Sequence, residues 1–221
     1  MPIVPDKVVR SRRKTLSVGV DCLGQVTVRA PLKYPDEKIR EFLAQKESWI
    51  LKHKQRMAGA GIRLPGETLD GYELLLLGEK HLITLYDGKS VRFAAEEKRI
   101  WLPRNNAENK LRAWIKQNAD RIFKEATKRR AEEMGVAYQS VTVSSARTKW
   151  GSCTGDNRLS FSFRLLYAPK DVIDYVIVHE LSHTLHHDHS KSFWGCVESV
   201  VPDYKVKRKW LKDRAALQRI L

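Results

Sequence analysis

The sequence predicts an α+β protein with a β-rich N-terminal half, and two patterns support this class. Over the first 103 residues, short apolar stretches alternate with turn-forming residues, as expected for strands. After Pro103, long amphipathic patterns predict helices around a single pair of strands. The chain has 221 residues, 42% of them hydrophobic, which suits one large domain or two small ones. We expect two parts, residues 1–103 and residues 104–221.

The first part should contain a hairpin, a helix and a small antiparallel sheet. Alternation over residues 15–28, with a turn at 21–25, predicts the hairpin. A helix opens at Pro35 and Asp36 and runs to about Met57. The apolar stripe of this helix consists of Ile39, Phe42, Leu43, Trp49 and Ile50. The antiparallel sheet is expected from four later stretches, YELLLL, HLITLY, SVRFAA and RIWLP.

The second part should contain a long helix, two strands and several shorter helices. Residues 106–134 form one basic amphipathic pattern, and a glycine follows as a helix stop. Two strands come next, joined by a turn at 154–157. Pro169 suits the first turn of the following helix, which should end near His186. Another helix is expected to start near Ser190. The helix with its end near His186 should pack on a small mixed or antiparallel sheet.

The chain is strongly basic, with a formal net charge of +15 and a pI near 9.8. This charge favours a polyanionic neighbour, either nucleic acid or an acidic protein surface. The tail from Asp203 onward is expected to be a helix whose cations are solvated. These cations are Lys205, Lys207, Arg208, Lys209, Lys212 and Arg214.

The cysteine pattern and the hydropathy predict a cytoplasmic protein that does not associate with membranes. Cys22, Cys153 and Cys196 are few and far apart, which argues against a disulfide scaffold and for a reducing compartment. The N-terminal residues lack the apolar core of a secretory signal. The longest apolar stretches are too short to span a bilayer.

The densest chemistry lies at residues 179–189, which read HELSHTLHHDH. On a helix, residues i and i+4 share a face, so His179 and His183 can direct two imidazoles at one point. His189 follows the helix end, from where the chain can turn back to close the set. Three neutral imidazoles and a water make the open, four-coordinate arrangement of a catalytic zinc site. The pattern therefore predicts Zn²⁺ bound by these three histidines.

Other side chains compete for the third ligand position. His186 would share the helical face of His183 only if the helix continued. His187 would extend the line of histidines along the helix axis, away from the metal. Glu198 resembles the glutamate ligand of another class of HExxH enzymes, but its spacing from the motif is short. Cys153, in the preceding strand, could ligate as a thiolate. We favour His189, then Glu198, then Cys153.

The motif also contains a candidate catalytic base. Zinc lowers the pKa of a bound water to around 7, so that hydroxide is available at neutral pH. Glu180 would accept the water proton and pass it to the leaving group. This chemistry is peptide or amide hydrolysis with a peptide or protein as substrate. Asp188 is a candidate for orienting one imidazole, although an Asp at this position is more often a turn or cap residue.

At these residues the sequence resembles the YgjP-like metal-dependent hydrolases, which are relatives of SprT and other zincin-type metallopeptidases. The matching segments are RTKWGSC at 147–153, VIDYVIVHELSH at 172–183, HSKSFW at 189–194 and PDYKVKRKWL at 202–211. By resemblance, His179, His183 and His189 bind zinc and Glu180 is the catalytic base. The resemblance also implies a zincin-like fold with the strand near Trp150–Cys153 lining the cleft. His186 stands where the extended zincin motif has glycine, so the chain departs from that subgroup.

Two other functions remain open from the sequence alone. A family of metal-dependent endoribonucleases has a similar histidine spacing, and the basic charge fits it. That family generally carries glycine where Glu180 stands, and it lacks the WGSC segment. The second alternative is a nucleic-acid-associated binding protein with a structural zinc. A closed structural site would need a fourth protein ligand.

Overall fold

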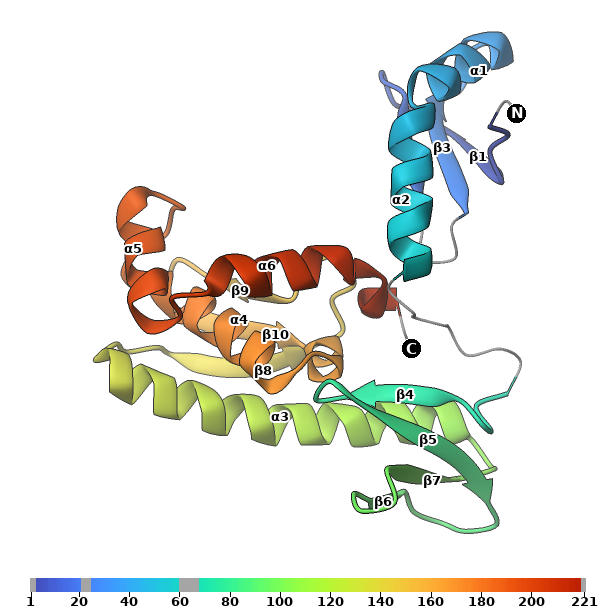
Figure 1. Cartoon of the computed structure of the whole chain (residues 1–221). Helices are drawn as coiled ribbons and strands as arrows, with labels where there is room; N and C mark the ends of the chain where they lie inside the picture. The colour runs from blue at the N-terminus through green and yellow to red at the C-terminus, as the bar shows by residue number, and fades with distance from the viewer. Residues whose placement is uncertain (1–2, 21–24, 60–67, 220–221) are drawn as a thin grey trace. The chain divides into compact units, whose positions relative to one another are not determined.

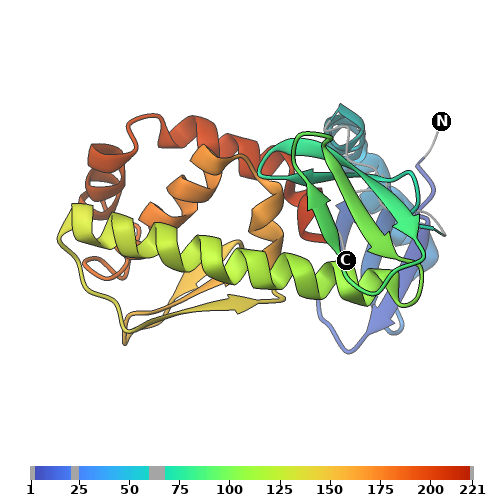
Figure 2. The ribbon, with the colours of Figure 1, turned by 90° about the horizontal axis from the view of Figure 1, so that it is seen from below.

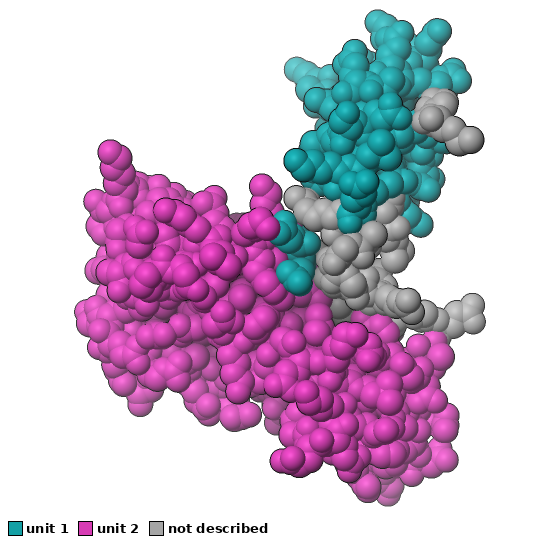
Figure 3. Space-filling model, viewed as in Figure 1, with its two compact units in different colours: residues 1–64, 213–216 teal, residues 65–212, 217–221 magenta. Residues whose placement is uncertain are grey.

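The computed structural model describes residues 3–20, 25–59 and 68–219. It divides into two compact units, which Figure 3 shows in different colours. Unit 1 comprises residues 1–64 and 213–216, and unit 2 comprises residues 65–212 and 217–221. The division into residues 1–103 and 104–221 stays a prediction; by backbone contacts, the strands between residues 73 and 103 belong with unit 2. No helix in the described ranges is long and apolar enough to cross a membrane.

Unit 1 is a three-stranded sheet with two helices (Figure 1). The predicted hairpin is confirmed, because β2 pairs with β3 in antiparallel register. A further strand, β1, was not predicted and pairs with β3 in parallel. The core contains Val26, Val28 and Ala30 of β3, which alternate toward the helices. The elements are β1 (Lys7–Ser11), β2 (Ser17–Val20), β3 (Val26–Pro31), α1 (Asp36–Gln45) and α2 (Glu47–Gly59).

The helix expected to run from Asp36 to about Met57 is two helices, so this prediction was wrong in one respect. Lys46 has φ −100° and ψ 6°, which ends α1, and α2 begins at the next residue. Ile39 and Ile50 reach the core as expected, whereas Trp49 is 41% exposed and stacks on His53.

The four-stranded sheet of unit 2 is mixed rather than antiparallel. Its order is β4-β5-β7-β6, and β5 runs parallel to β7. The central strand β7 buries Ile100 and Leu102, whereas β6 is short and carries the exposed Arg92 and Phe93. Burial therefore places β7 inside the sheet and β6 at the edge. The strands are β4 (Glu73–Leu76), β5 (Glu79–Tyr86), β6 (Arg92–Ala94) and β7 (Arg99–Pro103).

The rest of unit 2 is arranged along the predicted long helix, α3 (Ala107–Met134), which Figure 2 shows running past the shorter helices. Its buried residues recur every four positions, and Gly135 ends it with φ 65°, as expected. A mixed sheet of order β8-β10-β9 packs beside it, with β8 (Ser140–Ser144), β9 (Gly151–Cys153) and β10 (Arg158–Ser162). The segment predicted as one strand before the turn is thus two strands. The remaining elements are the 3-10 helix η1 (Phe163–Tyr167), α4 (Lys170–Ser182), α5 (Lys191–Val200), α6 (Tyr204–Asp213) and the 3-10 helix η2 (Ala215–Arg219).

The β4–β5 turn is docked against the start of α4. The Leu77 amide donates to the carbonyl of Leu166 at 2.8 Å, and Gly78 adopts φ +83°. A Cβ at Gly78 would lie 2.9 Å from Cα of Pro169, the residue that precedes α4. Glycine is therefore required at position 78 both by its backbone conformation and by this close approach.

Gly78→Ala should destabilise unit 2 more than Gly71→Ala does. Gly71 also has positive φ, at +75°, but a Cβ there would meet nothing within 4 Å. Gly71→Ala should cost about 1 kcal/mol from backbone strain alone, and Gly78→Ala about 3 kcal/mol because the clash adds to the strain. Urea unfolding of the two variants and the parent measures the difference. Equal losses would show that the turn is not held against Pro169.

Candidate metal centre

The centre is built on α4, which is almost wholly buried in unit 2. The apolar residues of this helix face inward on several sides, and Asp174 forms an ion pair with Arg130 of α3, Oδ2 to Nη2 at 2.5 Å. Pro169 stands at the N-cap, one position earlier than expected. The helix ends at Ser182, so that His183 is its C-cap and the chain is free to turn. This end comes close to the predicted one near His186.

Three histidines converge at this end of α4. The ligand atoms of His179, His183 and His189 all lie within 4.8 Å of one another. Nε2 of His179 and Nε2 of His189 are 3.3 Å apart. For a metal–nitrogen bond of about 2.0–2.1 Å, two corners of a tetrahedron are separated by about 3.3 Å. The three side chains could therefore hold one metal ion.

Two different devices orient the imidazoles. His183 donates from Nδ1 to the carbonyl oxygen of His186 at 3.0 Å, which leaves its Nε2 as the ligand atom. Nδ1 of His179 is buried and has no hydrogen-bond partner within the described part of the chain. The ring of His179 is held by aromatic packing instead: Tyr175, Phe193 and Trp194 lie with ring centroids 4.9–5.9 Å away.

Phe193 of α5 is the apolar centre of the site. Its ring centroid lies 4.9 Å from that of His179, 4.4 Å from His183 and 4.8 Å from His189. It is fully buried. Trp194, the next residue, packs on His179 and His189 and stacks on Tyr204 of α6. Helices α5 and α6 therefore fix the positions of the imidazoles.

Burial favours the neutral, metal-binding form of His179 and His183. The pKa of His179 is lowered to about 3, chiefly by burial and then by the neighbouring His183 and His189. Burial also lowers the pKa of His183, against the hydrogen bond to His186 that raises it. A neutral imidazole carries the lone pair that a metal requires. The donor set thus fits a divalent metal ion.

Glu180 lies beside the cluster on the same helix. It is 6% exposed, and its side chain packs against the backbone of Gly151 in β9. Burial raises the pKa of its carboxyl group to about 7, and Lys149 partly opposes this rise. The expected neighbourhood of the WGSC strand and the HExxH helix is confirmed, because β9 contacts α4.

The competing ligand candidates lie outside the cluster. Among the described residues, the group that could hold a metal contains the three histidines and neither Glu198 nor Cys153. Glu198 pairs with Lys205 at 3.9 Å, and Cys153 donates from Sγ to the carbonyl of Thr154. Asp188 accepts from the Ser190 amide at 3.1 Å, which makes it a turn residue rather than a partner of an imidazole.

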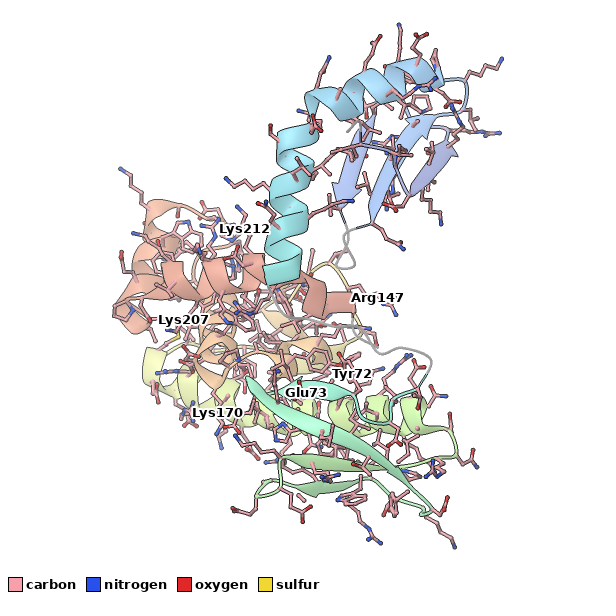
Figure 4. The ribbon with its side chains drawn as sticks, turned by 45° about the vertical axis from the view of Figure 1, so that its right-hand side comes forward. Tyr72, Glu73, Arg147, Lys170, Lys207 and Lys212 are labelled. Carbon is pink, nitrogen blue, oxygen red and sulfur yellow. The ribbon has the colours of Figure 1, made fainter. Side chains whose placement is uncertain are left out.

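One part of the prediction for the basic tail was wrong. Lys207 of α6, labelled in Figure 4, is not solvated: its side chain is 12% exposed. It pairs with Asp171 of α4 at 3.2 Å and with Asp203. The pair with Asp171 attaches α6 to α4, whereas the pair with Asp203 lies at the first turn of α6. Arg208 lies with its guanidinium 5.0 Å from the ring centre of Trp194.

Comparison with known proteins assigns the chain to a family. Residues 14–214 match the YgjP-like metallopeptidase domain. The chain belongs to the YgjP-like metallopeptidase family. This YgjP-like chain is also similar to a solved structure, the metallopeptidase zymogen of Pyrococcus abyssi abylysin, with 18% identity and a TM-score of 0.38. That similarity covers 41% of this chain and 92% of abylysin. No curated protein matches the chain significantly.

Two functional features of this YgjP-like centre were missed in the sequence. The contact of Gly151 with Glu180 has a visible signal, since a glycine in a short strand often marks a close approach of another group. The hydrogen bond from His183 to the carbonyl of His186 has no sequence signal, because every residue has a backbone carbonyl.

Replacing His189 should remove the metal, whereas replacing His187 should not. His189→Ala deletes one of three ligand atoms, so metal affinity should fall at least about tenfold. His187→Ala is the matched control from the same turn. Metal content after dialysis, measured by mass spectrometry, checks both variants, and chelation should lower the melting temperature of the parent more than that of His189→Ala. Equal metal content in parent and His189→Ala would contradict the assignment.

Proposed function

We propose that this protein is a zinc metallopeptidase that hydrolyses peptide bonds. In this proposal His179, His183 and His189 hold the zinc, and Glu180 is the general base. The observation that carries it is the convergence of three imidazoles at the end of α4, where Glu180, the residue after His179, is a buried carboxylate. We also propose that residues 104–221 form the catalytic half, since all four side chains come from it.

Zinc is the metal that this donor set favours. Three nitrogen ligands leave the fourth position open, which is the pattern of catalytic rather than structural zinc. When bound, zinc would supply a Lewis acid for the scissile carbonyl and a water acidic enough to be deprotonated at neutral pH. A fourth protein ligand is absent from the histidine cluster as far as the described residues extend.

Glu180 would move the protons of the reaction. Its carboxylate accepts a proton from the attacking water and then delivers it to the leaving amine. The peptide bond breaks as the carbonyl carbon gains the oxygen of that water. Phe193 and the buried face of α4 exclude bulk water on one side of the site, which strengthens electrostatic interactions there.

We propose that the substrate backbone binds along the edge strand β9. β9 is the last strand in the order β8-β10-β9, so only one of its two sides is paired within the described sheet. An extended peptide can add to such an edge through main-chain hydrogen bonds. This would bring the substrate beside Glu180, because the side chain of Glu180 packs on Gly151 of the same strand.

Glu180→Gln should keep the metal and lose peptide cleavage. The amide is nearly isosteric but cannot accept the proton, so kcat/KM should fall about 10²–10⁴-fold. Glu198→Gln is the control, because Glu198 lies on α5, more than half exposed, and outside the metal-binding group. Cleavage of casein and of a fluorogenic peptide gives the rates, and mass spectrometry gives the zinc content.

Three outcomes would contradict the proposal. Unchanged cleavage by Glu180→Gln would remove Glu180 as the base. Cleavage of RNA without cleavage of peptides would favour the endoribonuclease. Cleavage of neither, together with nucleic-acid binding that weakens steeply with salt, would favour a binding protein.

A further inference from the structure

Gly151 occupies the place where any other residue would collide with Glu180. A Cβ built on Gly151 would lie 2.6 Å from Oε1 of Glu180, 2.7 Å from Cγ and 2.9 Å from Cδ. Real Cβ atoms essentially never approach other heavy atoms this closely. The closest atom belongs to the carboxylate itself. The lack of a side chain at position 151 is therefore what leaves room for the carboxylate.

The backbone of Gly151 gives no other reason for glycine. Gly151 lies in strand β9, opposite Phe161 in antiparallel register, and does not adopt a positive φ. An L-residue can adopt this extended conformation without strain. The three nearest atoms that a Cβ at position 151 would meet all belong to Glu180, so this contact is what favours glycine there.

The backbone is held in place on both sides of this contact. Gly151 is held in the sheet, where Leu159, Ser160 and Phe161 of β10 pair with β9. Glu180 is 6% exposed, and it follows His179 directly on a helix whose buried face fixes its direction. A methyl group at position 151 must therefore turn the Glu180 side chain away and move its carboxylate, because the backbone of both residues is fixed.

We propose that Gly151 is a positioning residue for Glu180. The backbone of β9 at Gly151 packs directly against the carboxylate. This contact holds the carboxylate where it can accept a proton. The catalytic consequence rests on the proposed function. The physical contact does not, so it can be tested without any substrate.

The activity arm compares Gly151→Ala with Gly155→Ala. Gly155 lies in the turn after β9, where a Cβ would meet nothing within 4 Å, so Gly155→Ala should behave like the parent. Gly151→Ala should lower kcat about tenfold to a hundredfold, part of what a positioned general base contributes. KM should change less than about twofold and zinc content should stay the same, because the ligands are untouched. Unchanged kcat in Gly151→Ala would overturn the proposal.

The stability arm is a double-mutant cycle on the melting temperature. Glu180→Ala removes Cγ, Cδ and Oε1, the three atoms that approach position 151. Gly151→Ala should lower the melting temperature in the parent and should leave it unchanged or raised in the Glu180→Ala background. An equal loss in both backgrounds would show that the strand itself requires glycine, which would overturn the proposal.

The two arms separate failure of this inference from failure of the proposed function. A parent protein that holds zinc and cleaves no peptide would contradict the peptidase, whereas the melting cycle would still decide whether Gly151 sets the position of Glu180. If the parent cleaves peptides but Gly151→Ala lowers the melting temperature equally in the parent and in the Glu180→Ala background, the role of Gly151 is contradicted. The proposed peptidase function is then unaffected.

Discussion

The hydrogen bond from Nδ1 of His183 to the carbonyl of His186 is the interaction on which the metal centre depends. It performs two tasks at once. It fixes the ring of His183 with Nε2 free, and it ties that ring to the turn that follows Ser182, which backbone hydrogen bonds close. If the helix continued, residue 189 would lie about 9 Å farther along its axis than residue 183, at 1.5 Å per residue. The third imidazole meets the other two only because the chain turns back at this point.

The aromatic surroundings of the histidines hold the same site rigidly. Phe193 touches all three rings, and Trp194 links two of them to Tyr204 of α6. Burial lowers the pKa of His179 to about 3, so protons do not compete with a metal for its lone pair. The ion pair between Lys207 and Asp171 then attaches α6 to the helix that carries the ligands. Metal affinity and the packing of three helices are therefore coupled in this fold.

Local patterns predicted the elements that local forces determine. The buried residues of α3 recur every four positions from Leu111 to Ala131, so the span of this 28-residue helix and its end at Gly135 could be predicted. The i, i+4 spacing of His179 and His183 likewise predicted their convergence. The order β4-β5-β7-β6 could not be predicted, because it depends on which strand buries more apolar surface in the assembled sheet. The exposure of Trp49 was missed because neighbouring residues on a helix point about 100° apart, and it is Ile50 that reaches the core.

The burial of Glu180 is easier to explain in the proposed catalytic centre than in a structural metal site. A buried carboxylate costs free energy unless it is paired, and no ion pair to Glu180 occurs among the residues that the structure describes. A structural zinc site gains nothing from such a group beside its ligands. A hydrolase does, because an acid–base residue with a pKa near the operating pH transfers protons efficiently in both directions. If the carboxylate must hold one position next to the metal, two observations are explained. These are the unfavourable burial of Glu180 and the presence of glycine at position 151.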